Sequence, residues 1–392
     1  MEDRTQGSRR AAEELDILIL GPVPPPFGGI SVHVTRLVSL LSAAGFSVGV
    51  LNHFRGTDQP FVLAALNRSP LRYYRLPRRF PARVVHYHHS RWPHLVAFAI
   101  GRGARSRYIL TLHAGDVRKH FPQLISRVPF MSRITRWSLT RFDLVITVDP
   151  SIAAAVREHT SARVEVIPAF IASEGTECDR YEPQLEDFLR EGRVLLVAAY
   201  GVQFMNGREL YGLDTVIEAF VALAPTRKDA RLAIFIAQRP SERKARHHLE
   251  QLEQCLRDAN VETRVRVVYG LPLLPAFRRN TIFVRPTRAE GDAVSVREAR
   301  WAGVPVVASD VIARPTGVTT FAVGDASELR NALDSALDQP IQEREVSESD
   351  TPSSPEAFSE RLIQLYREEL SQLERDGDRL PREAEPHPRD AV

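Results

Sequence analysis

Short, wholly apolar runs alternate along the first part of the chain with stretches whose apolar residues recur every three or four positions. The run Leu15–Leu20 has the length and composition of a buried strand, and residues 30–45 after it have helical spacing. Further strand-like runs follow at 47–54, 82–90, 106–112, 142–148 and 162–168. Buried strands that alternate with amphipathic helices predict a parallel sheet with right-handed crossovers.

The same alternation returns in the second part of the chain. Strand-like runs begin near residues 193, 230, 264 and 281, with helical spacing between them. The predicted fold class is therefore α/β, with two Rossmann-like domains. The predicted divisions are a disordered N-terminus (1–13), the first domain (14–171), an acidic linker (172–190), the second domain (191–345), a last helix (355–375) and a disordered tail (376–392).

The composition is that of a globular protein of more than one domain. Of 392 residues, 43% are apolar and 26% charged, and no apolar run approaches the roughly 20 residues needed to cross a bilayer. The N-terminus is polar and charged, unlike a secretory signal. Cys178 and Cys255 neither demand nor exclude an oxidising compartment. We therefore expect a cytoplasmic protein.

Charge is unevenly distributed, although the formal net charge is only +3. Between Arg55 and Arg141 there are 17 Lys and Arg residues against two acids, whereas the part beyond Pro340 is rich in Glu and Asp. A basic face favours anionic partners such as an anionic membrane surface, bound peripherally. A nucleic-acid partner is disfavoured, because the basic residues interleave with the strands of an α/β core.

The stretch Thr281–Asp310 has the pattern strand, polar loop, helix, strand. It carries two carboxylates, Glu290 and Glu298, with seven residues between them. The free N–H groups and positive dipole end of the helix start favour a bound phosphate, and Glu298 can accept hydrogen bonds from a ribose diol. Ligands of open α/β sheets bind at such strand-to-helix loops. Either Glu alone would be an ordinary surface acid, but together they predict a sugar-nucleotide site.

This stretch resembles the Glu-x7-Glu signature of family 4 retaining glycosyltransferases. The matching positions are Pro286, Glu290, Gly291, Glu298, Ala299, Gly303, Pro305 and Val306. The resemblance implies the GT-B architecture, in which two Rossmann-like domains face each other across a cleft and the last helix crosses back to the first domain. It also implies a nucleoside-diphosphate sugar as donor and no metal or other cofactor.

The resemblance also implies roles for individual residues. Glu290 is expected to orient the donor sugar and stabilise its oxocarbenium-like centre, and Glu298 to hold the ribose. His113, in a loop similar to the family's His-Gly-x-Asp, is expected to contact the sugar, and Asp116 to serve acceptor binding or proton handling. The phosphates are expected to lie against Gly28, Gly29, Gly291, Asp292, Ala293, Val294 and Ser295.

The chain departs from the family pattern where the diphosphate is expected. Val202 and Tyr211 stand where the family has Arg and Lys, and residues 168–171 are Pro-Ala-Phe-Ile where it has Asn-Gly-Val-Asp. A departing dianion needs preorganised positive charge, so other cations must replace the missing ones. Arg208 and Arg285 are the expected replacements. Other arginines near the signature are Arg288, Arg297 and Arg314.

A histidine cluster ends the strand-like run at 82–90. His86, His88 and His89 invite comparison with a zinc site, but no Cys or nearby carboxylate completes a ligand set. We therefore expect no metal there, and expect these side chains to line the cleft between the domains or its rim. His33, a lone histidine on the first predicted helix, is expected to be structural or to lie at the cleft rim.

The favoured function is a retaining glycosyltransferase that moves a sugar from a nucleoside-diphosphate sugar to a lipid-linked glycan at the cytoplasmic membrane face, in surface polysaccharide biosynthesis. The alternative is a catalytically inactive GT-B subunit that acts as a scaffold in a polysaccharide assembly complex. The missing Arg and Lys favour the scaffold, whereas Glu290, Glu298 and His113 favour the enzyme. A phosphorylase of the same fold is disfavoured, because this sequence has no lysine placed for a cofactor Schiff base. An epimerase is disfavoured because the sequence has no epimerase-like pattern.

Overall fold

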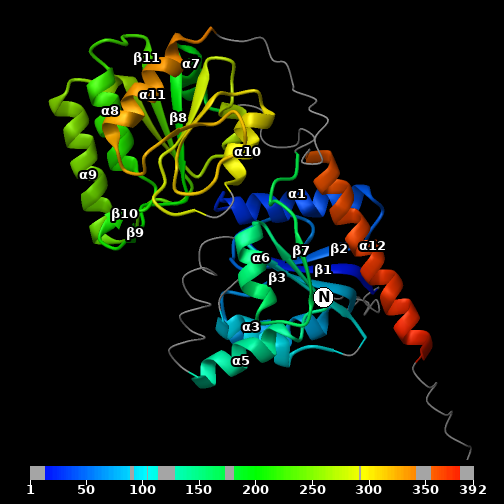
Figure 1. The fold of residues 1–392 in the computed structure, drawn as a ribbon. Coiled ribbons are helices and arrows are strands. Elements are labelled where there is room, and N and C mark those ends of the chain that lie inside the picture. Colours follow the sequence, from blue (N-terminus) through cyan, green and yellow to red (C-terminus); the bar gives the residue numbers. More distant parts are fainter. Residues whose placement is uncertain are drawn as a thin grey trace, which may run out of the picture.

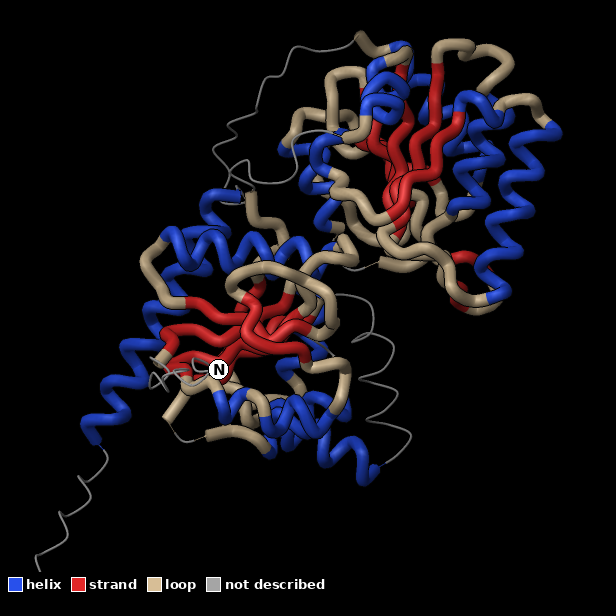
Figure 2. Tube along the Cα trace, turned by 180° about the vertical axis from the view of Figure 1, so that it is seen from behind, coloured by secondary structure: helices blue, strands red, loops and turns tan. Residues whose placement is uncertain are grey.

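The computed structural model describes residues 14–88, 92–103, 105–113, 129–172, 181–290, 293–340 and 355–379. Two separate parallel sheets, each with helices on both faces, form two lobes, as Figure 1 and Figure 2 show from opposite sides. The predicted fold class of two Rossmann-like α/β domains is confirmed. Among the described residues, no helix combines the length and apolarity needed to span a membrane.

The first sheet has seven strands in the order β3-β2-β1-β4-β5-β6-β7. These are β1 (Leu15–Gly21), β2 (Val48–Asn52), β3 (Val62–Ala65), β4 (Ala82–His88), β5 (Arg107–Leu112), β6 (Leu144–Thr147) and β7 (Arg163–Val166). Residues 17–20 of the central strand β1 are fully buried, because successive side chains enter the two opposite hydrophobic cores.

Helices cover both faces of this sheet. One face is packed by α1 (Gly29–Ala43) and α12 (Pro355–Arg379). The other face is packed by α2 (Pro70–Arg75), α3 (Trp92–Ile100), α5 (Pro129–Leu139) and α6 (Pro150–Arg157), with a 3₁₀ turn at Pro77–Arg79. The sheet is therefore buried on both sides, as its nearly continuous apolar strands predict.

The second sheet has six strands in the order β12-β11-β8-β13-β14-β15. These are β8 (Arg193–Ala199), β11 (Ala230–Ile236), β12 (Val265–Tyr269), β13 (Thr281–Arg285), β14 (Val306–Ser309) and β15 (Thr319–Phe321). Helices α8 (Leu213–Leu223), α9 (Arg243–Asp258) and α11 (Ala326–Asp338) pack one face. Helices α7 (Pro183–Arg190) and α10 (Val294–Trp301) pack the other.

Three local features differ from the sequence-based expectation. Residues 183–190, expected in the linker, form α7, because its Phe188 and Leu189 are buried in the second domain's core. A hairpin of β9 (Phe204–Met205) and β10 (Arg208–Glu209) follows β8, and the positive φ angles of 52° at Asn206 and 79° at Gly207 form its turn. Helix α12 continues past residue 375 to Arg379.

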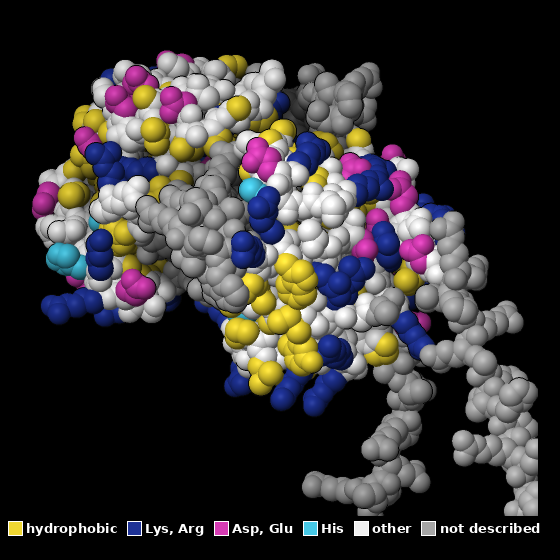
Figure 3. Space-filling view, turned by 60° about the horizontal axis from the view of Figure 1, so that its bottom comes forward, with side chains coloured by type: hydrophobic (Ala, Val, Ile, Leu, Met, Phe, Trp, Pro, Cys, Tyr) yellow, Lys and Arg dark blue, Asp and Glu magenta, His cyan; other side chains and the backbone are white. Residues whose placement is uncertain are grey.

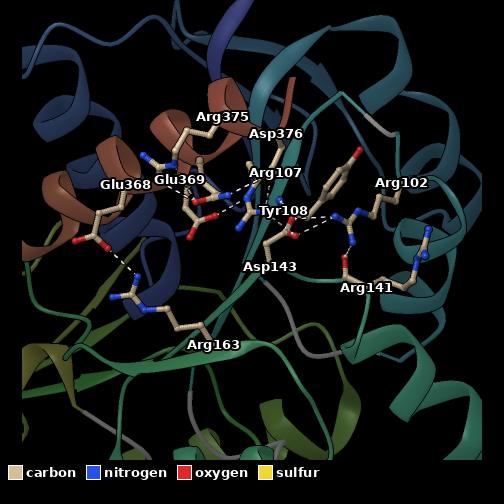
Figure 4. Close-up of polar contacts among 11 residues, drawn as sticks. Arg102, Arg107, Tyr108, Arg141, Asp143, Arg163, Glu368, Glu369, Arg375 and Asp376 are labelled. Carbon is tan, nitrogen blue, oxygen red and sulfur yellow. Dashed lines mark hydrogen bonds and ion pairs between the residues drawn. The ribbon is translucent and has the colours of Figure 1, made fainter. Parts of the chain in front are cut away.

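Helix α12 lies on the first sheet, although the chain reaches it from the second domain (Figure 1). Its inner face includes the fully buried Tyr366. Figure 4 shows the polar contacts along its edge: Arg107 Nε donates to Glu369 at 2.8 Å, and Arg163 Nη1 to Glu368 at 2.7 Å. Acidic residues of the last helix thus pair with arginines of the first domain.

Candidate active site between the two domains

A cavity of about 170 Å³ lies between the domains, at the carboxyl ends of β8, β11 and β13. The first domain contributes the Gly28–Gly29 loop and Val32 of α1. The second contributes the strand ends, the loop at 271–274, and residues 293–295 and 298 of the start of α10. The cavity therefore joins the Gly-Gly loop and the Glu signature, which lie in separate domains, at the sheet edge where such folds bind ligands.

Gly28 allows the two domains to approach closely. Its backbone is extended, with φ −154° and ψ 163°, so any residue could adopt the conformation. A Cβ atom at this position would instead lie 2.7 Å from the Tyr200 ring of the second domain. At Gly29 the nearest atom to an added Cβ is Val294 Cγ2, at an ordinary 3.8 Å. The lack of space beside the Tyr200 ring, and not the backbone conformation, therefore favours glycine at position 28.

Residues at the start of α10 line the cavity. Ala293 is the N-cap, and an alanine side chain has no polar atom to occupy the first-turn amides. Ala293, Val294 and Ser295, which were predicted to contact the phosphates, line the cavity, and a helix start leaves amide donors for an anion. The candidates Asp116, Gly291 and Asp292 lie outside the described residues, as does His89.

Glu298 lines the cavity and forms an ion pair with the other domain. Arg36 Nη2, on α1, lies 2.6 Å from Glu298 Oε1, and the two side chains are only 6% and 8% exposed. No feature of the sequence pointed to Arg36, because the chain is rich in arginine and the pair forms only when the domains meet.

Glu290 is clamped by two arginines. Arg285 Nε donates to Oε1 at 2.7 Å, and Arg314 Nη1 donates to Oε2 at 2.7 Å. Thr287 Oγ1 lies 3.2 Å from Oε2. Burial by itself would raise the pKa of Glu290, but the charges of Arg285 and Arg314 outweigh it and hold that pKa below its usual value. Glu290 is therefore a fixed, ionised carboxylate.

Arg285 lies beside Tyr211, which stands where the family has its lysine. It lines the cavity, and its guanidinium carbon lies 5.7 Å from the centre of the Tyr211 ring. Burial raises the pKa of Tyr211 to about 12, so its phenol is neutral and supplies no charge. Arg208 is exposed on β10 and is not among the residues that line the cavity, contrary to its predicted role. Val202 is buried in the second domain's core.

Three histidines converge inside the first domain. Possible ligand atoms of His33, His88 and His113 lie within 4.8 Å of one another, a different trio from the one adjacent in sequence. His88 Nδ1 lies 3.0 Å from His113 Nε2, and His33 Nδ1 lies 2.7 Å from the Ala169 carbonyl. Burial, and then the charges of neighbouring histidines, lower the pKa of His88 well below its usual value. Imidazole nitrogens so placed could hold a metal ion.

His86 does not line the cleft, contrary to the sequence-based expectation. It is fully buried between β4 and α12, where Nε2 lies 2.7 Å from Thr111 Oγ1 and Nδ1 contacts the Tyr366 hydroxyl. The apolar face of α12 covers it, and sequence spacing alone did not reveal that contact.

Two Rossmann-like domains with a cavity between them, at strand ends of the second domain, form the GT-B fold. Two family models match the chain: "Glycosyltransferase Family 4" over residues 27–174 and "Glycosyl transferases group 1" over residues 201–339. Together the two models cover most of the chain, and with the fold they support a family 4 glycosyltransferase of the GT-B type. The lipopolysaccharide core biosynthesis mannosyltransferase LpsB of Rhizobium meliloti is 25% identical over 338 residues, 82% of this chain and 88% of that protein.

Solved structures show the same fold. Sucrose-phosphate synthase from Thermosynechococcus elongatus is similar with a TM-score of 0.65 at 17% identity, over 91% of this chain and 99% of that one. HepE from Anabaena, in complex with UDP and glucose, is similar with a TM-score of 0.58 at 14% identity, over 94% of this chain and 100% of that one. The predicted GT-B fold and family are confirmed.

Proposed function

We propose that this glycosyltransferase is a retaining enzyme that moves a sugar from a nucleoside-diphosphate sugar to a lipid-linked glycan in surface polysaccharide biosynthesis. The observation that carries the proposal is the cavity that sets Glu298 and the start of α10 opposite the Gly28–Gly29 loop. A carboxylate accepts ribose hydroxyls and helix-start amides bind phosphate, so one cavity suits both parts of a nucleotide. The name of LpsB and the UDP in HepE support this substrate class.

Arg285 is proposed to take the place of the missing diphosphate cations. Arg285 and Arg314 share the single carboxylate of Glu290, which leaves one net positive charge beside the cavity. With the dipole of α10, this charge would stabilise the departing diphosphate, and we expect transfer without a metal ion. Glu290 would anchor Arg285 and orient the donor sugar, and His113 would contact that sugar. Departure and attack would then occur on one face of the sugar, with retention.

An anionic membrane surface is the proposed location of the acceptor, at the cytoplasmic face. Leu71, Ile100 and Trp137 on α2, α3 and α5 are 54%, 55% and 44% exposed. Exposed arginines on the same elements and the turn after α2 are Arg72, Arg75, Arg78, Arg79, Arg133 and Arg136. Figure 3 brings this underside forward and shows hydrophobic side chains gathered with Lys and Arg at their edge. Apolar side chains ringed by cations suit anionic lipid.

Titration with nucleotides tests the enzymatic proposal. Thermal-shift measurements with UDP, GDP, ADP and dTDP should show a preference for one of them, since a ligand that binds the folded state raises Tm by mass action. The shift should be lost in Glu298→Ala, and transfer from the matching nucleotide sugar should persist in EDTA and give a product of retained anomeric configuration. No shift with any nucleotide at millimolar concentration would favour the inactive scaffold instead.

Sedimentation with lipid vesicles tests the membrane proposal. Binding should be stronger to anionic than to neutral vesicles and should weaken with salt, because screening reduces the attraction of the arginines. Ile100→Glu should weaken binding. Val323→Glu is the matched control, because Val323 is a 44% exposed apolar residue of the second domain. Equal recovery on both kinds of vesicle would count against a membrane-docking face.

A further inference from the structure

Helix α1 of the first domain and helix α10 of the second meet in a buried ion pair. Arg36 Nη2 lies 2.6 Å from Glu298 Oε1, with side-chain exposures of 6% and 8%. Arg36 Nη1 also donates to the Ile171 carbonyl at 3.1 Å. The guanidinium group is thus fixed by the backbone of its own domain and presented to a carboxylate of the other.

Apolar contacts between the same elements surround this ion pair. Val294, at the start of α10, is buried in a hydrophobic cluster of the first domain, and Trp301, at its end, packs against that cluster. The Trp301 ring centre lies 6.1 Å from that of Phe170. In such surroundings a buried charge is costly unless it is compensated, so the charges of Arg36 and Glu298 stabilise each other where α10 contacts the first domain.

We infer that Arg36 is a positioning residue for donor binding, which orients the Glu298 carboxylate and ties that orientation to the observed contact between the two domains. The inference rests on the proposed function, because it assigns the ribose of the nucleoside-diphosphate donor to Glu298. A carboxylate offers about four lone-pair sites. One oxygen therefore stays on Arg36 while the other accepts the ribose hydroxyls from the cavity.

Arg36 is not among the residues that line the cavity, but it contacts Glu298, which does line it. Through this contact Arg36 acts on the affinity for the nucleotide. If Arg36 loses its charge, Glu298 is left buried without this cation, and it must protonate, rotate or draw water into the domain interface. Each of these responses changes the group that the ribose meets. Because the ion pair joins the two domains as they are arranged here, donor binding at Glu298 and this arrangement should favour each other.

Four variants separate this role from a general effect on folding. Arg36→Met removes the charge but keeps much of the side-chain length, and Arg36→Lys keeps the charge. Glu298→Gln removes the partner charge, and the double variant Arg36→Met/Glu298→Gln removes both charges of the pair. Circular dichroism and thermal melting establish that each variant is folded. Calorimetry with the nucleotide that the wild-type protein prefers, and steady-state kinetics, then give Kd, KM and kcat.

We expect Arg36→Met to weaken nucleotide binding and raise the donor KM by roughly tenfold or more, with a smaller change in kcat. Arg36→Lys should recover most of this loss. The double variant should bind no more weakly than Glu298→Gln alone, because residues that act through one contact are not additive.

Two outcomes would overturn the inference. The first is normal nucleotide affinity and KM in a folded Arg36→Met protein, and the second is a double variant whose loss equals the sum of the single losses. Either would leave the proposed function standing, provided that the wild-type protein binds a nucleotide. A wild-type protein that binds none would overturn the proposed function, and this role for Arg36 with it.

Discussion

Glu290 is a single carboxylate that faces two guanidinium groups, with Arg285 Nε and Arg314 Nη1 each at 2.7 Å. Glu290→Gln keeps the shape of the side chain but removes the charge that both arginines face. We expect kcat for sugar transfer to fall by about 10²–10³-fold, as when one charge-stabilising group is lost from an active site. Initial rates at saturating donor measure the effect. Glu242→Gln, at an exposed acid before α9, should leave kcat unchanged; normal turnover in Glu290→Gln would refute the role of Glu290.

His33 makes stability depend on pH. Burial, assisted by the charge of Arg36 and opposed by the bond to Ala169, lowers the pKa of His33 from 6.5 to about 4. Between these values the unfolded chain binds a proton that the folded protein does not, so stability falls as the pH falls through this window. Two and a half pKa units correspond to about 3 kcal/mol.

Urea unfolding at about pH 7 and about pH 4.5 measures this loss. His33→Asn should lose less stability between the two pH values than the wild-type protein. Part of the pH dependence should remain, because burial also lowers the pKa values of His86 and His88. If the variant lost as much stability as the wild type, His33 would not be buried as a neutral ring.

Residue by residue, the sequence revealed carboxylates more readily than their partners. Glu290 and Glu298 stood out because their spacing relates a loop to the helix that follows it, which is a local property. Arg36 is separated from Glu298 by most of the chain, and only the meeting of α1 with α10 brings the two together. Arg314 lay near the signature, but one arginine among many carried no signal of its contact with Glu290.

At the scale of elements, the attachment of helix α12 to the first domain includes ion pairs that differ in burial. Glu369 is 5% exposed as a side chain and pairs with Arg107 at 2.8 Å, whereas Glu374 is 66% exposed and pairs with Arg83. Glu369→Ala should lower the free energy of unfolding by about 3 kcal/mol, because it leaves a partly buried guanidinium without this partner. Glu374→Ala, on the same helix, should cost no more than about 1 kcal/mol.

Urea unfolding monitored by circular dichroism gives both values. Arg107 also contacts Asp143 at 3.3 Å, so the loss in Glu369→Ala should stay near the lower end of the range for a broken buried pair. Equal losses in the two variants would mean that burial does not decide the strength of these contacts.

The sequence predicted elements well where one face or both are wholly apolar. Strand β1 was evident because residues 17–20 enter two cores at once. Helix α7 was missed because its acidic and polar positions match those of a linker, although Phe188 and Leu189 are buried. The hairpin at 204–209 was missed because two-residue strands carry no periodicity, and only the Asn-Gly turn marked it.

Across the whole molecule, ion pairs between the basic stretch and the acidic last helix neutralise part of the charge asymmetry seen in the sequence. Arg83 and Arg107, in the basic stretch, pair with Glu374 and Glu369 of the acidic last helix. These contacts remove some of the basic residues from the surface offered to an anionic partner. The exposed arginines of α2, α5 and the turn after α2 remain, and they lie on the face of the first sheet opposite α12.

The close approach of the two domains depends on Gly28, because glycine has no side chain. An added Cβ would lie 2.7 Å from the Tyr200 ring, so the ring or the domain must shift before the cavity can close as observed. Gly28→Ala should therefore weaken nucleotide binding by about tenfold, the effect of a cost near 1.4 kcal/mol. Its Tm without ligand should hardly change, because both domain cores lie elsewhere. Calorimetry and thermal melting measure the two quantities.

Gly29→Ala provides the matched control. It adds the same methyl group one residue away, where the nearest atom is Val294 Cγ2 at 3.8 Å, and an alanine suits the first turn of a helix. Gly29 also lines the cavity, so the affinity of this variant for nucleotide should fall, but by less than in Gly28→Ala, because the added methyl group leaves the approach of the two domains unchanged. Small-angle scattering of nucleotide-bound samples should show a larger radius of gyration for Gly28→Ala than for Gly29→Ala. Equal affinities and equal radii would mean that Tyr200 moves aside freely and that the approach of Gly28 to Tyr200 does not control closure.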